Sequence, residues 1–77
     1  MAEKSAAAEL VEFVARAIVG NPDDVKVHEP EPRLLELETA PEDRGRVIGR
    51  QGRVAKAMRA VLAASRAGAD HRLEIVD

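Results

Sequence analysis

Two glycines separated by two residues, Gly49 and Gly52, lie among basic side chains and suggest a site for an anion. Glycine lets a backbone come close to a bulky partner, and the start of a following helix offers unpaired N–H groups and a positive dipole end. Arg50 lies between the glycines, and Arg53 and Lys56 lie on the first turn after them. These cations would surround one position, which favours a phosphate ligand.

The charge of the chain is divided into blocks. Residues 1–43 hold four basic and eleven acidic residues, whereas residues 44–69 hold seven basic residues and no acidic one. The formal net charge of the chain is −2, so the average hides a basic segment that coincides with the glycine pair. Such a local basic segment is typical of a protein that binds a polyanion. Charge and helical spacing add these residues to the candidate site: Arg46, Arg53, Lys56 and Arg59.

The composition excludes several classes of function. The chain has 77 residues and no cysteine, so it holds no disulfide, no thiolate metal site and no thiol nucleophile. Its two histidines, His28 and His71, are isolated, and no spacing indicates a metal site, a catalytic triad or a nucleotide-binding fingerprint. We therefore predict that the protein is not an enzyme and uses no catalytic residue, metal or cofactor.

No segment is suited to a membrane. The uncharged stretches, such as Ala60–Ser65, are far shorter than the roughly 20 apolar residues of a membrane span. The N-terminus, Met1–Lys4, does not lead into the apolar core of a signal peptide. We expect no membrane partner and a cytoplasmic location.

An amphipathic helix is predicted over residues 5–19. Its apolar residues recur at the spacing of one helical face, and Gly20 is suited to a left-handed cap that ends it. Phe13 belongs to this apolar stripe, and Met58 belongs to a similar stripe later in the chain, so we interpret both as core residues.

Three strands are predicted from alternating patterns. Residues 25–28 and 35–39 form a short hairpin-like pair, because each places its apolar side chains on one face. Glu29–Pro32 is interpreted as the connection, because its two prolines cannot supply a continuous ladder of hydrogen bonds. Residues 72–76 alternate again and close the chain as a third strand.

Two further helices flank the glycine pair. The first is predicted to begin at Thr39 as N-cap, with Pro41 in the first turn, and it ends at the break between Gly49 and Gly52. The second restarts at about Arg53 and is ended by Gly68. Its apolar stripe consists of Val54, Ala57, Met58, Val61 and Leu62.

The order helix, strand, strand, short helix, long helix, strand predicts an α+β fold with two layers. Three strands would form one sheet, with the helices packed on one of its faces. The length corresponds to a single domain over residues 1–77, of which we expect residues 1–5 to be disordered.

The segment Val47–Arg53 resembles the signature of a KH domain, whose GxxG loop clamps the backbone of about four single-stranded nucleotides. The order of the elements is similar to the prokaryotic, type II, KH arrangement. The likeness extends over residues 8–76 and includes Asn21–Asp23 and Ala40–Asp43. Over this length the chain resembles the small single-KH RNA-binding proteins of bacteria, the KhpA type.

The resemblance implies a non-catalytic module that grips short single-stranded RNA, as a post-transcriptional regulator or an RNA chaperone. Gly49 and Gly52 would permit close approach, and Arg50 and Gln51 would face the sugar-phosphate backbone. The apolar floor beneath the bases would be formed by Ile48 and Ala55, although many KH domains have a large aliphatic residue where this chain has Ala55. Members of the family are also described as homodimers and as partners of a second KH-containing RNA-binding protein.

Two other functions stay open at this stage. The helices around the glycine turn could form a helix-turn-helix that reads duplex DNA, although strand patterns bracket the turn. The alanine-rich helix could instead pack against a protein partner or a second copy, with little intrinsic affinity for RNA. The small residues that would allow this approach are Ala55, Ala57, Ala60, Ala63, Ala64 and Ala67.

Overall fold

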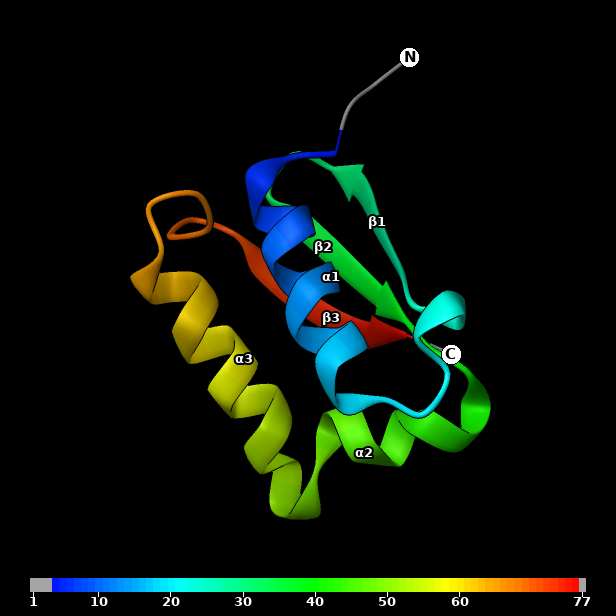
Figure 1. Ribbon diagram of the computed structural model, residues 1–77. Helices are drawn as coiled ribbons and strands as arrows, with labels where there is room; N and C mark the ends of the chain where they lie inside the picture. The colour runs from blue at the N-terminus through cyan, green and yellow to red at the C-terminus, as the bar shows by residue number, and fades with distance from the viewer. Residues whose placement is uncertain (1–3, 77) are drawn as a thin grey trace.

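The structure, a computed structural model, describes residues 4–76, and Figure 1 shows how their helices and strands are arranged. Three α-helices and three strands alternate along these residues with short 3₁₀ turns at Pro22–Asp24, Pro41–Asp43 and Arg50–Gly52. The main elements are α1 (Ala6–Ile18), β1 (Lys26–Glu31), β2 (Leu34–Glu38), α2 (Arg44–Ile48), α3 (Arg53–Ala64) and β3 (Arg72–Val76).

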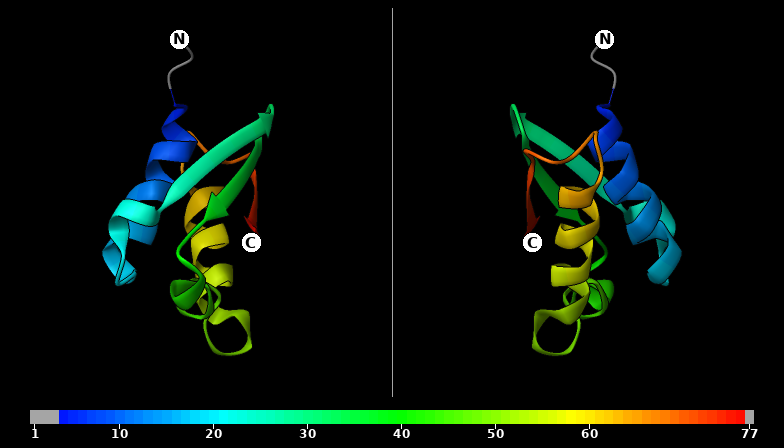
Figure 2. Two further views of the ribbon diagram at one scale, coloured as in Figure 1. Left: turned by 90° about the vertical axis from the view of Figure 1, so that its right-hand side faces the viewer. Right: turned by 90° about the vertical axis from the view of Figure 1, so that its left-hand side faces the viewer.

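The strands form one sheet in the order β1-β2-β3. β1 and β2 are antiparallel neighbours, whereas β2 and β3 are parallel, and Leu35 lies beside Leu73. Because side chains alternate along a strand, Val27, Leu35, Leu37 and Leu73 all project from the same face. The helices cover this face, as the two views of Figure 2 show. The predicted two-layer α+β fold and its element order are therefore confirmed.

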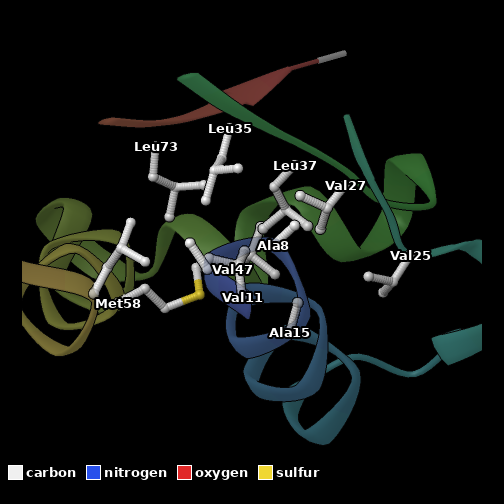
Figure 3. Close-up of a cluster of buried hydrophobic side chains, with 12 residues drawn as sticks. Ala8, Val11, Ala15, Val25, Val27, Leu35, Leu37, Val47, Met58 and Leu73 are labelled. Carbon is white, nitrogen blue, oxygen red and sulfur yellow. The ribbon is translucent and has the colours of Figure 1, made fainter. Parts of the chain in front are cut away.

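The core lies between the sheet and the helices. Figure 3 shows the strand side chains pointing from one side towards residues of α1, α2 and α3. Leu35, Leu37 and Val47 are completely buried, and Leu62 is 2% exposed. Helix α1 contributes mainly small side chains, which let it pack close to the sheet. Its buried residues are Ala7, Ala8, Val11 and Ala15.

The prediction that Phe13 is a core residue is wrong, because 75% of its surface is exposed. Successive residues of a helix are about 100° apart, and Phe13 lies on the side of α1 opposite Ala8 and Ala15. The apolar positions of α1 extend beyond one face, so the stripe alone did not identify the buried side. Met58 is buried with 5% exposure, as predicted.

The first strand is longer than predicted. β1 continues through Glu29 and Pro30 to Glu31, so most of the expected connection is strand. The pairing with β2 is irregular between His28 and Glu31, which is the place where Pro30 supplies no N–H group. The prolines therefore interrupt the ladder without ending the strand.

The boundaries of three helices also differ from the predictions. Thr39 does not cap a helix: its hydroxyl donates to the Ala40 carbonyl, and a 3₁₀ turn precedes α2. Val19, with extended backbone, ends α1 in place of Gly20. α3 ends before Ser65, while Gly68 packs so tightly on α3 that an added Cβ would lie 2.3 Å from Leu62 Cδ1.

Residues 1–5 are predicted to be disordered, and of these residues 1–3 lie outside the described range. The hydroxyl of Ser5 accepts a hydrogen bond from the Ala8 N–H at 3.1 Å and caps α1. Lys4 forms an ion pair with Glu12.

Asp43 joins the end of α1 to the start of α2. Its side chain is buried, with 3% exposure, and accepts hydrogen bonds from the N–H groups of Gly20 and Asn21 at 3.1 and 3.0 Å. The Asn21 side-chain amide donates a third, at 3.0 Å. The pKa of Asp43 lies below its ordinary value of 3.8, chiefly because of the Asn21 amide, with further contributions from the two N–H groups and the positive charge of Arg46; burial opposes the shift.

The lowered pKa of Asp43 predicts an acid-sensitive contribution to stability. The ionised carboxylate stabilises the fold above the ordinary value of 3.8, and this contribution is lost as the pH falls through the lower pKa of the folded state. Asp43→Asn should therefore lower the Tm at neutral pH, and the Tm difference between variant and wild type should narrow as the pH falls below about 4. Thermal melts between neutral pH and about pH 3 measure this difference, with Asp70→Asn in an exposed turn as the control variant. A Tm difference that is constant with pH would contradict the stabilising role of the ionised Asp43 carboxylate.

Candidate functional site

The glycine pair forms a tight turn between α2 and α3, at the end of the molecule away from the N-terminus (Figures 1 and 2). Gly49 ends α2 with φ +77°, and its N–H donates to the Gly45 carbonyl at 2.8 Å. Gln51 and Gly52 both have left-handed backbone, with φ +57° and +73°. The Gly52 N–H donates to the Gly49 carbonyl at 3.1 Å and closes the turn.

The two glycines are required for different reasons. A Cβ on Gly49 would lie 2.5 Å from Val54 Cγ2 and 2.8 Å from the Val54 backbone nitrogen, so this residue permits close packing of the turn on α3. A Cβ on Gly52 would meet nothing within 4 Å. Gly52 therefore supplies its left-handed φ and leaves the surface beside the helix start open.

Several exposed polar side chains gather around this open start of α3. Gly52 is the N-cap and has no side chain to satisfy the first N–H groups of the helix, and the first turn carries no acidic residue. Arg53 and Lys56 are exposed on the first turn, and Arg50 and Gln51 are exposed in the loop. Arg53 also donates to the Gln51 side-chain oxygen at 3.5 Å. The Arg53 N–H donates to the Arg50 carbonyl, and the helix dipole together with three cations creates an environment that favours a phosphate.

Other predicted site residues lie elsewhere or are engaged. Arg46 is exposed, but its guanidinium lies near the turn at Gly20 and acts on Asp43. Ala55 is buried with 4% exposure, which leaves little of its methyl group for a base, whereas Ile48 is 38% exposed beside the loop. Arg59 lies two turns further along α3, and its Nε donates to the Leu73 carbonyl of β3 at 3.1 Å.

Neither a metal-holding group nor a membrane-spanning helix is found among the described residues. No group of three or more His, Cys, Asp or Glu residues among them could hold a metal ion. Within residues 4–76, no helix has the length and apolar character needed to cross a membrane.

Sequence reasoning missed one residue that positions the loop. Asp43 fixes α2 to the end of α1, and α2 ends directly at Gly49. Its partners lie 22 and 23 residues earlier in the chain, so no local pattern signals the contact. The only sequence signal was an acidic residue near a helix start, which is common at such positions.

Comparison with known proteins identifies similar chains. The family described as "KhpA/KhpB, KH domain" matches residues 8–76. A protein of Clostridium perfringens named "RNA-binding protein KhpA" is 52% identical over 60 residues, which cover 74% of this chain and 80% of the relative. The proteins of the same name from Halalkalibacterium halodurans and Streptomyces coelicolor are 47% and 43% identical, covering 88% and 90% of this chain and 96% and 90% of theirs. No solved structure matches the chain significantly.

Alanine substitutions should separate the roles of the two glycines. Gly49→Ala combines a backbone conformation that almost only glycine adopts with a collision against Val54, so it should destabilise the protein by about 3 kcal/mol or more. Gly52→Ala meets only the left-handed penalty of about 1–2 kcal/mol. Urea denaturation of both variants measures the difference, and equal losses would contradict this account of the turn.

Proposed function

The chain belongs to the KhpA/KhpB KH-domain family, and from this premise we propose that it is a non-catalytic module that binds short single-stranded RNA through its GxxG loop. The observation that carries the proposal is the exposed turn Gly49–Gly52, which presents Arg50 and Gln51 beside the uncapped start of α3. The related proteins are named for RNA binding, which agrees with the phosphate chemistry of this turn.

In the proposed complex the RNA backbone lies against the loop. Gly49 and Gly52 allow close approach, Arg50 and Gln51 face the phosphates and sugars, and the N–H groups at the start of α3 bind a phosphate. Arg53, Lys56 and Arg59 follow at intervals of three along α3, so they would form a basic row beside the bound RNA. Ile48 is the exposed apolar residue nearest to the loop in sequence and would contact a base.

The contacts with phosphate carry little sequence information, because every nucleotide offers the same backbone. This favours a general role, as an RNA chaperone or a post-transcriptional regulator acting on many RNAs. The length of α2 also favours RNA as the ligand. A helix-turn-helix that reads duplex DNA needs a first helix that supports the recognition helix, and α2, with Arg44–Ile48, is too short to do so. We place the protein in the cytoplasm, where such RNAs are translated.

Replacing Arg50 and Gln51 by Asp should abolish RNA binding without unfolding the protein, because both side chains are exposed. The matched control is Arg66→Asp with Ala67→Asp, which makes the same charge change in an exposed loop away from the turn. Fluorescence anisotropy with a short single-stranded RNA measures affinity over a salt series. The logarithm of the wild-type affinity should fall with log salt by roughly 0.7 per phosphate contact. Equal binding by the two double variants would overturn the proposal.

A second role is supported by the outer surface of α3. Its residues form an exposed row of small apolar side chains around Val61, which is 48% exposed. We propose that a second copy covers this row, because α3 carries basic and no acidic residues while the first turn of neighbouring α1 carries the exposed Glu9. A two-fold pair that lays α3 of one copy beside α1 of the other brings unlike charges together. The row consists of Ala57, Ala60, Val61 and Ala64.

Val61→Glu should make the protein monomeric while leaving binding at the GxxG loop intact, because it introduces a charge into the contact. Ala63→Glu, on a different side of α3, is the control. Analytical ultracentrifugation over a concentration series measures the oligomeric state. A wild type that is monomeric throughout would overturn the homodimer and would leave a second KH-containing protein as the partner to test on this face.

A further inference from the structure

The turn that follows α1 runs beside the start of α2, as Figure 1 shows. Asn21 lies in this turn and is the N-cap of the 3₁₀ turn Pro22–Asp24, but its side chain makes no capping hydrogen bond. Asparagine is one of the residues whose side chains most often cap a helix. The Asn21 amide donates instead to Asp43 Oδ2 at 3.0 Å, 22 residues later in the chain. The side chain of Asn21 therefore serves a tertiary contact rather than its own turn.

Both oxygens of the Asp43 carboxylate are bound by this turn. Oδ1 accepts from the Gly20 N–H at 3.1 Å, and Oδ2 accepts from the Asn21 N–H and the Asn21 amide, each at 3.0 Å. Contacts at both oxygens fix the orientation of a carboxylate as well as its position. The guanidinium of Arg46 lies near the same turn, since a Cβ on Gly20 would be 4.0 Å from Arg46 Nη1. Asn21 thus supplies two of the three hydrogen bonds that fix Asp43.

Helix α2 connects Asp43 to the GxxG loop. Asp43 is the N-cap of α2, and Gly49 follows its last residue, about 9 Å away along the helix axis. Among the described residues 44–48 only Val47 is buried, so one apolar side chain anchors this helix in the core. A tilt of roughly 10° at Asp43 would displace the loop by about 1.5 Å, more than the roughly 0.5 Å that a precise binding geometry tolerates.

The loop needs this support because part of its backbone is strained. Gln51 has left-handed backbone, with φ +57°, although it is not glycine. Such a conformation persists only where the surrounding structure holds it. Arg50 and Gln51 are exposed in this loop, so the direction of their side chains depends on how α2 is oriented.

We propose that Asn21 is a positioning residue for RNA binding. The proposal rests on the proposed function. The Asn21 amide keeps Asp43 fixed against the end of α1, and Asp43 fixes the start of α2. Helix α2 then presents Arg50 and Gln51 to the RNA backbone. Asn21 itself lies 28 residues before Gly49 and needs no contact with RNA.

Asn21→Ala removes one hydrogen bond to Asp43 and keeps both backbone N–H bonds, so the fold should persist. The affinity for an oligouridine of about four nucleotides, measured by fluorescence anisotropy, should fall about three- to tenfold, because fewer molecules hold the loop ready to bind. The slope of log affinity against log salt should stay as in wild type, because the complex contacts the same phosphates. Arg50→Gln removes a cation from the loop and should reduce the size of that slope by about 0.7.

The matched control is Ser5→Ala, which removes the hydrogen bond that caps the other end of α1. It should lower the Tm comparably and leave the RNA affinity unchanged. Asn21→Asp places a second carboxylate beside Asp43 and should weaken RNA binding more than Asn21→Ala does. Adding Asp43→Asn to Asn21→Asp removes this repulsion and should recover part of the affinity.

Amide hydrogen exchange without RNA measures the order of the loop itself. The N–H groups of Gly49 and Gly52 donate to the Gly45 and Gly49 carbonyls, and they should exchange faster in Asn21→Ala but at the wild-type rate in Ser5→Ala. The positioning role is overturned if Asn21→Ala matches Ser5→Ala in exchange or in RNA affinity, or if its salt slope falls. If wild type binds no RNA, the proposed function fails, and the exchange rates alone decide whether Asn21 positions the loop.

Discussion

The carboxylate of Asp43 connects the turn after α1 to the start of α2, and the position of the loop between α2 and α3 depends on this connection. It accepts three hydrogen bonds from the turn that follows α1, and the short helix α2 begins immediately after it. α2 has only five residues, too few to form a stable helix alone, so its orientation depends on what holds its ends. Asp43 fixes one end, and the packing of Gly49 against Val54 fixes the other. The loop between α2 and α3 therefore takes its position from a side chain that does not touch it.

The features that sequence could predict are those encoded by neighbouring residues. The alternation in residues 35–39 and 72–76 and the three-and-four period of α1 and α3 identify the elements and their order. The glycine turn was also predictable, because a left-handed backbone and a close contact each require glycine at a fixed place. Arg50, Arg53 and Lys56 are neighbours of the glycines in the chain, so their position beside the turn followed from the sequence alone.

The features that sequence could not predict depend on which face of an element meets the rest of the molecule. Phe13 belongs to an apolar stripe, but the small side chains of Ala8 and Ala15 form the buried face of α1. Arg59 was recognised as a basic residue near the loop, but its bond to the Leu73 carbonyl depends on the placement of an edge strand 14 residues later. Such pairings are set by tertiary packing, for which one sequence carries no local signal.

The parallel pairing of β2 with β3 has a consequence for how the molecule assembles. Parallel neighbours cannot be joined by a hairpin, so residues 39–71, which contain the loop and both flanking helices, form the crossover between them. The two ends of this long crossover must come together for β3 to pair with β2. Contacts between residues so far apart in the chain slow folding. Residues 39–71 precede β3 in the chain, so the loop and both flanking helices are synthesised before the strand that completes the sheet. The pairing of β3 with β2 is thus the most distant contact along the chain that completes the sheet, whereas the turn between α2 and α3 is held by contacts close in sequence.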